Sequence, residues 1–304
     1  MDRSTVSYLT FGVVLILAVV FDLGLLSKKG TTISLKKAMW MTLFWVGLAM
    51  SFFVFLWMED GHKTAVAYLS AYVMEWSLSV DNIFVFILIF TFFGVKPAYY
   101  ARVLLIGILV AVLLRILFIS VGIVLVDKAH WVLYIGGAIL VASGVRLFVH
   151  RHEAEPDIGK DPVYRFLRRV LPLTNDDGGG KFVIVRDGKK WYTSLFFVVV
   201  LLATSDVVFA VDSIPAVFGI TTQNVVIFTS NIFAVLGLRS LFFLLRGAFD
   251  RFRHLQQGIA VVLIFVGVKM LIEYFHVDLP IYVSLLVILV CLGVSMLYSL
   301  FSRK

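Results

Sequence analysis

Nine long apolar runs dominate the sequence, and each is close to the length that a helix needs to cross a lipid bilayer. The hydrocarbon layer is about 30 Å thick, so about 20 helical residues span it. This pattern predicts an all-α, polytopic membrane protein of about nine transmembrane helices. The predicted helices cover residues 7–26, 38–58, 64–93, 103–126, 131–149, 193–218, 224–246, 255–275 and 279–300.

Composition agrees with a membrane protein. Hydrophobic residues make up 61% of the 304 positions and charged residues only 15%, whereas a soluble domain is about half apolar and about a quarter charged. The net charge of +8 comes from loops between the runs, which indicates lipid headgroups rather than nucleic acid as the partner. The single cysteine, Cys291, excludes a disulfide framework and a thiolate metal cluster.

The basic residues are distributed unevenly between alternate loops. Of the 27 Lys and Arg residues, 20 fall in one set of loops, 3 in the other set and 4 inside the runs. Cytoplasmic loops of membrane proteins carry the excess of basic residues. The count predicts an external amino terminus and a cytoplasmic carboxyl terminus, with residues 59–63 and 127–130 outside.

The one large polar segment, residues 150–192, is cytoplasmic by the same count. Residues 163–171 (VYRFLRRVL) are typical of a short basic amphipathic helix on a membrane surface. Residues 181–193 (KFVIVRDGKKWYT) predict two short strands around an Asp187-Gly188 turn. A passive linker is the simpler interpretation of this segment, and a gate or sensor stays open.

The chain contains an internal repeat. Three pairs of short motifs recur in the same order, with offsets of 131, 124 and 123 residues. Each match is weak alone, but three matches in register indicate a duplication. The pairs are LSVDNIFVF at 78–86 with FAVDSIPAV at 209–217, LRILF at 114–118 with LRSLF at 238–242, and GVRL at 144–147 with GVKM at 267–270.

The repeat unit holds three predicted helices, so the two units have inverted topology. Inverted repeats are typical of secondary transporters, whose substrate sites lie near the midplane between the units. A duplicated scaffold without a transport role is the alternative. The chain then divides into two amino-terminal helices (1–63), repeat 1 (64–149), the cytoplasmic segment (150–192), repeat 2 (193–276) and a carboxyl-terminal helix (277–304).

Polar side chains lie in the middle of one predicted helix in each repeat. A charge inside a span costs about 2.5–3.5 kcal/mol on insertion scales, so such residues are candidates for function. Both sets have the same spacing: a carboxylate, a second carboxylate six residues later, and then a neutral oxygen-bearing side chain. The candidate ligands are Glu75, Asp81 and Asn82 in repeat 1 and Asp206, Asp212 and Ser213 in repeat 2.

Helix geometry sorts these residues into faces. Positions seven apart share a face at about 100° per residue. Glu75 therefore shares a face with Asn82, and Asp206 shares one with Ser213. Each helix presents two oxygen-bearing stripes if it stays regular.

Pro215 predicts that the helix over 193–218 does not stay regular. Proline cannot donate a hydrogen bond to the carbonyl four residues earlier, here that of Val211. The freed carbonyl lies beside Asp212. Broken helices with freed carbonyls are a common way to coordinate cations inside membranes.

The ligand types narrow the substrate. Every buried candidate is a carboxylate, an amide or a hydroxyl, whereas the six histidines lie in loops or at the ends of spans. Hard oxygen ligands suit magnesium, calcium or manganese(II) and argue against zinc and copper. The ion is expected as a transported substrate, and no permanently bound cofactor is predicted.

Two buried arginines offer a structural interpretation of the same carboxylates. Arg115 and Arg239 lie inside predicted helices and need anions or carbonyl oxygens nearby. An Asp81–Arg115 or an Asp212–Arg239 pair could exist only to hold helices together.

Two further predictions concern polar residues inside helices. Asn231, halfway along the helix over 224–246, is either a ligand or part of a helix–helix hydrogen bond. Lys269 and Glu273 are four residues apart near a helix end, which predicts an ion pair between them.

The segments EWSLSVDNIFVF (75–86), TSDVVFAVDSIPAVFGITTQ (204–223) and FTSNIFAVLGLRSLFFLL (228–245) carry a family resemblance. They resemble the TerC family of tellurite-resistance-associated membrane proteins, in particular its Alx-like branch. The similarity extends through nearly the whole chain. It implies a bacterial inner-membrane protein with nine helices and a role in manganese(II) export.

The resemblance also implies a set of site residues. Some members of the family carry a further glutamate one turn before the second motif, where this chain has Ala203, which removes a candidate ligand and affects the expected ion preference or affinity. The family's acidic positions fall on Glu75, Asp81, Asp206 and Asp212, with Asn82, Ser213 and Asn231 beside them.

Three hypotheses follow. The leading one is a secondary transporter that exports manganese(II), with protons as the counter-ion. The second is calcium or magnesium exchange. The third, from another class, is a membrane assembly or stress-complex subunit that transports nothing. An enzyme is not expected, because the sequence has no nucleotide-binding loop, nucleophile elbow or zinc-protease motif.

Overall fold

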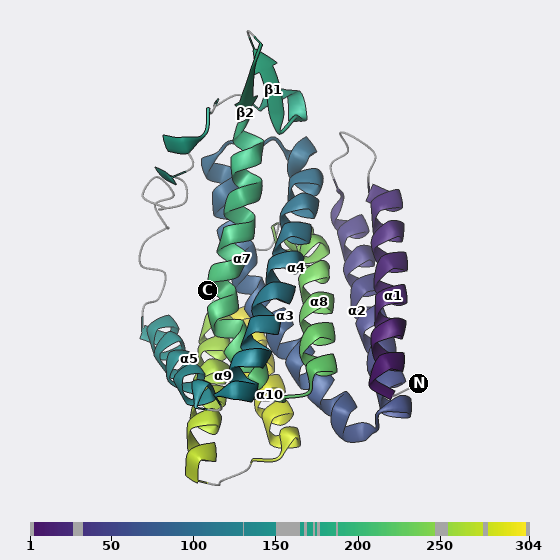
Figure 1. The fold of residues 1–304 in the computed structure, drawn as a ribbon, viewed down its shortest axis with the longest axis vertical. Helices are drawn as coiled ribbons and strands as arrows, with labels where there is room; N and C mark the ends of the chain where they lie inside the picture. The colour runs from purple at the N-terminus through teal and green to yellow at the C-terminus, as the bar shows by residue number, and fades with distance from the viewer. Residues whose placement is uncertain are drawn as a thin grey trace.

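In the computed structural model, the described residues form a bundle of nine long α-helices (Figure 1). It describes residues 3–26, 33–129, 131–149, 165–166, 169–172, 174, 177–186, 188–246, 255–275 and 279–301. The prediction of an all-α, polytopic membrane protein is confirmed. The long helices are α1 (Arg3–Leu26), α2 (Leu35–Glu59), α3 (His62–Phe92), α4 (Pro97–Lys128), α5 (Val132–Val149), α7 (Ser194–Phe218), α8 (Asn224–Leu245), α9 (Leu255–Ile272) and α10 (Ile281–Phe301).

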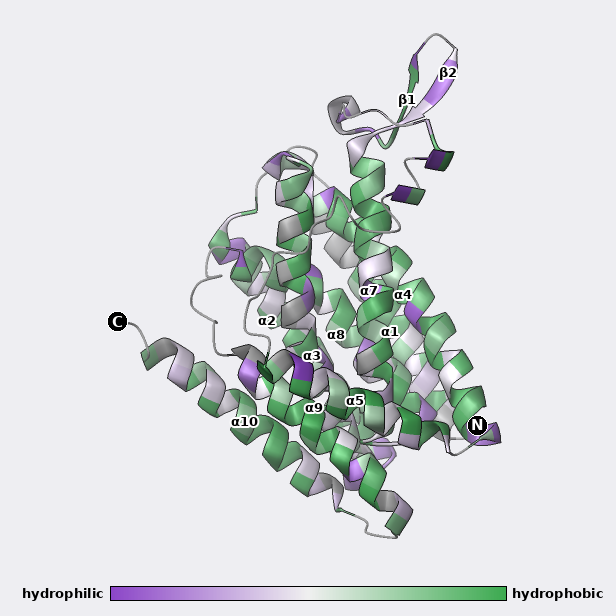
Figure 2. Cartoon of the chain, turned by 90° about the vertical axis from the view of Figure 1, so that its left-hand side faces the viewer, coloured by the Kyte–Doolittle hydropathy of each residue, from purple (hydrophilic) through white to green (hydrophobic). Residues whose placement is uncertain are grey.

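The outer helices present apolar surface. Parts of α2, α4, α7, α8 and α10 are long and apolar enough to cross a membrane, and α1, α5 and α9 contain shorter apolar stretches. On α1, the side chains of Leu9, Val13, Ile16 and Leu17 are more than half exposed. Figure 2 shows mainly hydrophobic colours on the helices and hydrophilic ones on β2 (Lys189–Tyr192). Exposing this much apolar surface to water would be unfavourable, so lipid chains cover it.

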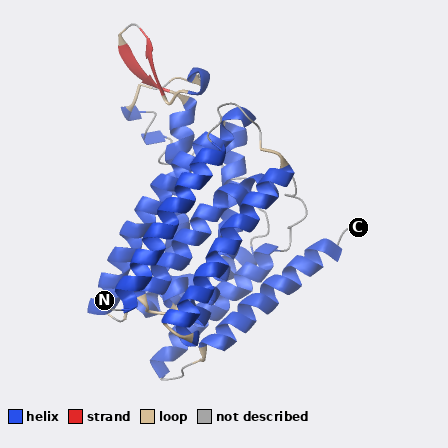
Figure 3. Ribbon diagram, turned by 90° about the vertical axis from the view of Figure 1, so that its right-hand side faces the viewer, coloured by secondary structure: helices blue, strands red, loops and turns tan. Residues whose placement is uncertain are grey.

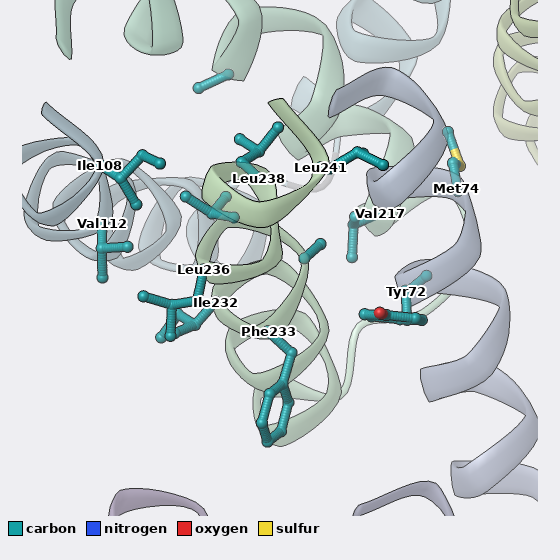
Figure 4. Close-up of a cluster of buried hydrophobic side chains, with 14 of the residues drawn as sticks. Tyr72, Met74, Ile108, Val112, Val217, Ile232, Phe233, Leu236, Leu238 and Leu241 are labelled. Carbon is teal, nitrogen blue, oxygen red and sulfur yellow. The ribbon is translucent and has the colours of Figure 1, made fainter. Parts of the chain in front are cut away.

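α8 lies in the middle of the bundle. Nearly all of its residues are buried, and it packs against α2, α3 and α4. Figure 4 shows Phe233 and Leu236 of α8 in one apolar cluster with Tyr72 of α3 and with Ile108 and Val112 of α4. α8 is thus buried on all sides, as expected of a helix at the centre of a membrane bundle.

The two predicted repeats pack mainly on each other. α3 packs against α8, α4 against α7, and α5 against α9. At the α5–α9 crossing, a methyl group added at Gly137 would lie 2.9 Å from the carbonyl oxygen of Gly267, and one added at Gly144 would lie 2.7 Å from that of Ala260. Glycine is needed there because the two backbones approach this closely. The two contacts are equivalent under the repeat offset of 123, because this offset relates Gly137 to Ala260 and Gly144 to Gly267. The Gly137–Gly267 contact in one unit therefore corresponds to the Ala260–Gly144 contact in the other.

α3 and α7, which carry the equivalent acidic motifs, run in opposite directions. The ring of Phe93, just after α3 ends, stacks with that of Phe197 near the start of α7, with centroids 6.2 Å apart. The end of one helix therefore lies beside the beginning of the other. This is the arrangement expected of an inverted repeat.

The predicted hairpin is present. β1 (Val183–Arg186) pairs with β2 in antiparallel register, and Gly188 has the positive φ of 73° that the turn requires. The hairpin lies beyond one end of the helices (Figure 3). Of the predicted surface helix over 163–171, the structure describes residues 165–166 and 169–171, and 165–166 and 169–170 are helical. Asp187 lies outside the described residues.

The base of the hairpin is attached to the connection between α3 and α4. Nζ of Lys96 lies 2.6 Å from Oδ2 of Asp177, and Nη1 of Arg102 donates to the carbonyl oxygen of Gly180 at 2.9 Å. The Arg102 guanidinium also lies 4.9 Å from the ring centroid of Phe182. Both segments were predicted to lie on the same side of the membrane, and these contacts agree.

α7 runs unbroken through Pro215, so the predicted break is wrong. Pro215 lies in the last turn of the helix, where its missing amide affects only the carbonyl of Val211. The amide of Gly219 still donates to the carbonyl oxygen of Pro215 at 2.9 Å. Gly136 of α5 leaves room for the ring, because a methyl group there would lie 3.0 Å from Cβ of Pro215.

Candidate ion-binding site

Arg115, in the middle of α4, is buried in the interior of the bundle. Its Nε donates to Oδ2 of Asp206 at 3.0 Å, and its Nη2 donates to Oδ1 of the same carboxylate at 2.9 Å. Its Nη1 donates to Oε1 of Glu75 and to Oδ1 of Asn231, the latter at 2.8 Å. A guanidinium therefore lies between two carboxylates that come from different predicted repeats.

Four helices that are distant in the sequence assemble this site. Every contributing side chain is at most 2% exposed, so water does not screen the charges. Such a cluster of ionisable groups within the membrane is a default candidate for function. α3 supplies Glu75 and Asn82, α4 supplies Arg115, α7 supplies Asp206 and Ser213, and α8 supplies Asn231.

The predicted helix faces meet at this site. Nδ2 of Asn82 donates to Oδ1 of Asp206 at 3.5 Å, and Nη1 of Arg115 reaches Oγ of Ser213 at the same distance. Glu75 and Asn82 thus point from one face of α3 toward Asp206 and Ser213 on one face of α7. The structure brings together five of the seven predicted ligands, namely these four residues and Asn231.

The other predicted site residues are Asp81, Asp212, Arg239 and Lys269. Asp81 and Asp212 lie in α3 and α7, but their side chains are outside the part of the chain that the structure describes. Arg239 is buried in α8 with an exposed fraction of 3%. Nζ of Lys269 donates to Oγ of Ser284 on α10 at 3.2 Å, and the side chain of its predicted partner Glu273 is not among those described.

Two buried polar atoms near the site lack a hydrogen-bond partner among the described residues. They are Oε2 of Glu75 and Oγ of Ser79. Ser79 lies one helical turn after Glu75, so both side chains belong to one face of α3. The sequence reasoning missed Ser79, although its spacing of four residues from Glu75 was a usable signal.

The charges at the site do not cancel. Glu75 and Asp206 carry two negative charges when ionised, and Arg115 carries one positive charge. Breaking a buried pair by removal of one partner costs about 3–5 kcal/mol, because the other charge stays buried. The excess negative charge and the free oxygen of Glu75 can accept a further cation or a proton.

The oxygens at the site are those that hard cations use. Carboxylate, amide and hydroxyl oxygens suit magnesium, calcium and manganese(II). Among the described residues no three acidic, histidine or cysteine side chains come together as a ready metal site. A metal ion at Glu75 and Asp206 therefore requires Arg115 to move, or ligands from Asp81 or Asp212.

Comparisons with known proteins identify relatives. The sequence model of a family described as "Integral membrane protein TerC family" matches residues 60–304. A membrane protein of Myxococcus xanthus is 42% identical over 284 residues, which cover 93% of this chain and 88% of the relative. A membrane protein of Rickettsia felis is 37% identical over 298 residues, or 98% of each chain.

A relative in Escherichia coli strain K12 carries the provisional name membrane-bound redox modulator Alx. It is 40% identical over 285 residues, which cover 90% of this chain and 88% of the relative. No solved structure matches the chain.

Proposed function

Because the chain belongs to the TerC family of integral membrane proteins, we propose that it is a secondary transporter that exports a hard divalent cation, with manganese(II) as its substrate. The observation that carries this proposal is the convergence of Glu75 and Asp206, one from each predicted repeat, on one buried cationic group. A buried position between two carboxylates that accommodates a guanidinium is also suited to bind a metal cation in its place.

The neighbouring side chains support a hard ion. Asn82, Ser213 and Asn231 add amide and hydroxyl oxygens around the two carboxylates. Oxygen ligands without imidazole or thiolate give no reason to prefer zinc or copper. Asp81 and Asp212, one residue before Asn82 and Ser213, are the proposed additional ligands.

Protons are the proposed counter-ion. Carboxylates that lose a metal ion inside the membrane leave uncompensated charge, and a proton removes it at low cost. Oε2 of Glu75 has no hydrogen-bond partner among the described residues, so it is the oxygen at which we place the proton. We expect export into the external space, with the carboxyl terminus in the cytoplasm of a bacterial inner membrane.

Two other roles are alternatives to transport. The name of the E. coli relative indicates a redox role, and the family resemblance implies a role in tellurite stress. The sequence carries one cysteine, Cys291 on α10, which cannot form a disulfide within the chain. The buried ionic site favours transport over these roles. Calcium or magnesium exchange would use the same oxygens and differs only in the ion.

The test is metal flux into proteoliposomes loaded with a metal-sensitive dye, with manganese, calcium, magnesium and zinc compared. We expect fast manganese flux, slow zinc flux, and loss of flux in Asp206→Asn. Asp177→Asn is the matched control, because Asp177 is also ion-paired but lies outside the helix bundle. Zinc flux faster than manganese flux would contradict the ligand argument, and absence of flux for every ion would favour the assembly role.

A further inference from the structure

The guanidinium of Arg115 is engaged on every nitrogen. Nε and Nη2 bind the two oxygens of Asp206, and Nη1 binds Glu75 and Asn231. The arginine comes from α4, whereas its partners come from α3, α7 and α8. The Arg115 side chain, from repeat 1, thus connects the two predicted repeats at the proposed ion site.

The charges show why a transporter needs such a group. A divalent cation between Glu75 and Asp206 cancels their charge, but an exporter must then return without the ion. A proton on Glu75 removes one of the two negative charges, but an ionised Asp206 without a cation would stay buried in a medium of low dielectric constant, and the metal-free protein would be unfavourable in every conformation that buries it. Arg115 supplies a positive charge that never leaves the protein.

We propose that Arg115 is a tethered counter-ion that occupies Glu75 and Asp206 when the transported divalent cation is absent, and so allows the empty transporter to return across the membrane. This inference rests on the proposed function. The metal ion and the guanidinium compete for the same oxygens, so the arginine withdraws when the ion binds.

The proposal separates two transport activities that a purely structural role would not separate. Exchange of manganese for manganese uses only the ion-bound protein in both directions. Net efflux also requires return of the empty protein. Arg115→Gln removes the counter-ion, so it should reduce net flux by at least about tenfold while exchange persists.

The experiment measures both activities in the same proteoliposomes. Net flux is followed as dye-detected manganese(II), and exchange is followed as uptake of radioactive manganese(II) into vesicles that already contain unlabelled manganese(II). Arg115→Lys keeps the charge, so its ratio of net flux to exchange should stay close to that of the wild type. Arg146→Gln is the control, because it neutralises an exposed arginine on α5 and should change neither activity.

Equal loss of both activities in folded Arg115→Gln, or retention of both, would overturn the proposal. If Arg115→Gln does not fold, loss of net flux with retained exchange in Arg115→Lys would overturn it as well. The failure of the proposed function looks different, because then wild-type protein shows neither activity for any divalent ion.

Discussion

Both oxygens of the Asp206 carboxylate accept hydrogen bonds from Arg115, at 3.0 Å from Nε and 2.9 Å from Nη2. This two-pronged geometry uses the planar fork of arginine, which lysine cannot reproduce. It joins α4 to α7, and Glu75 extends the link to α3. The same carboxylate thus joins helices through Arg115 and is a proposed ligand of the ion.

The double role of Asp206 can be separated with a pair of variants. Asp206→Asn should destabilise the protein by about 3–5 kcal/mol, because Arg115 then stays buried with less compensation. The double variant Asp206→Asn with Arg115→Gln should recover most of this loss in thermal unfolding in detergent. Manganese flux should stay absent in both variants. Recovery of flux in the double variant would show that Asp206 is only structural.

Ser79 is a test of whether a buried hydroxyl without a partner serves the ion. Ser79→Ala should leave stability unchanged or raise it by up to about 1 kcal/mol, because no hydrogen bond to a described residue is lost. Ser77→Ala is the comparison, since Oγ of Ser77 donates to the carbonyl oxygen of Val73 at 2.7 Å. Lower manganese flux in stable Ser79→Ala would add Ser79 to the ligands, and unchanged flux would remove it from consideration.

The ion pair between Lys96 and Asp177, which attaches the hairpin, should weaken only at acid pH. Hydrogen bonds from Lys96 and from the amide of Gly179 lower the pKa of Asp177 below its ordinary value of 3.8. A lowered pKa means that the stabilisation is fully present above pH 3.8 and is lost as the pH falls through the lower, folded-state value. We expect amide hydrogen exchange of residues 183–192 to be unchanged between pH 5 and 7 after correction for intrinsic rates. Loosening within that range would contradict the ion-pair account.

The close crossing of α5 and α9 should reject side chains. A methyl group added at Gly267 would lie 2.6 Å from the carbonyl oxygen of Gly137, so Gly267→Ala should lower stability by about 1–3 kcal/mol. Gly293→Ala on α10 is the matched control, because nothing lies within 4 Å of the added group. The melting temperature in detergent measures both. Equal melting temperatures would mean that the helices can separate at no cost.

The predicted orientation can be tested by labelling of single cysteines in a Cys291→Ser background. Gly61→Cys, in the α2–α3 turn, should react with an impermeant thiol reagent added to intact cells, and Gly179→Cys should not. Nothing lies within 4 Å of a side chain added at either position, but the positive φ values of 90° and 63° strain the backbone of any other residue, so the abundance of both variants is checked first. The opposite labelling would reverse the orientation and the direction of transport that we propose.

Local sequence rules predict much of this molecule. The apolar runs predict the long helices, and Gly188 between two alternating segments predicts the hairpin. The seven-residue spacing predicts that Glu75 faces with Asn82 and Asp206 faces with Ser213, and hydrogen bonds now connect these faces. These features depend on residues close in the chain, so sequence alone carries them.

Long-range features required the structure. The sequence shows that Arg115 needs an anion, but it does not show that α4 packs against α7, so the sequence suggests Asp81 and not Asp206 as the partner. Pro215 is similar. Its effect depends on its distance from the end of α7 and on the space that Gly136 leaves, and neither can be read from the proline itself.

The glycine crossing of α5 and α9 has a consequence for movement. The repeat relates Gly144 to Gly267 with an offset of 123 and Glu75 to Asp206 with an offset of 131. Both pairs therefore lie where the two predicted repeats meet, at the α5–α9 crossing and at the buried site around Arg115. The backbones at the crossing are already in close contact, so a change in the relative position of the repeats can rotate them about this point but cannot bring them closer. We therefore expect the crossing to shift least during such a change.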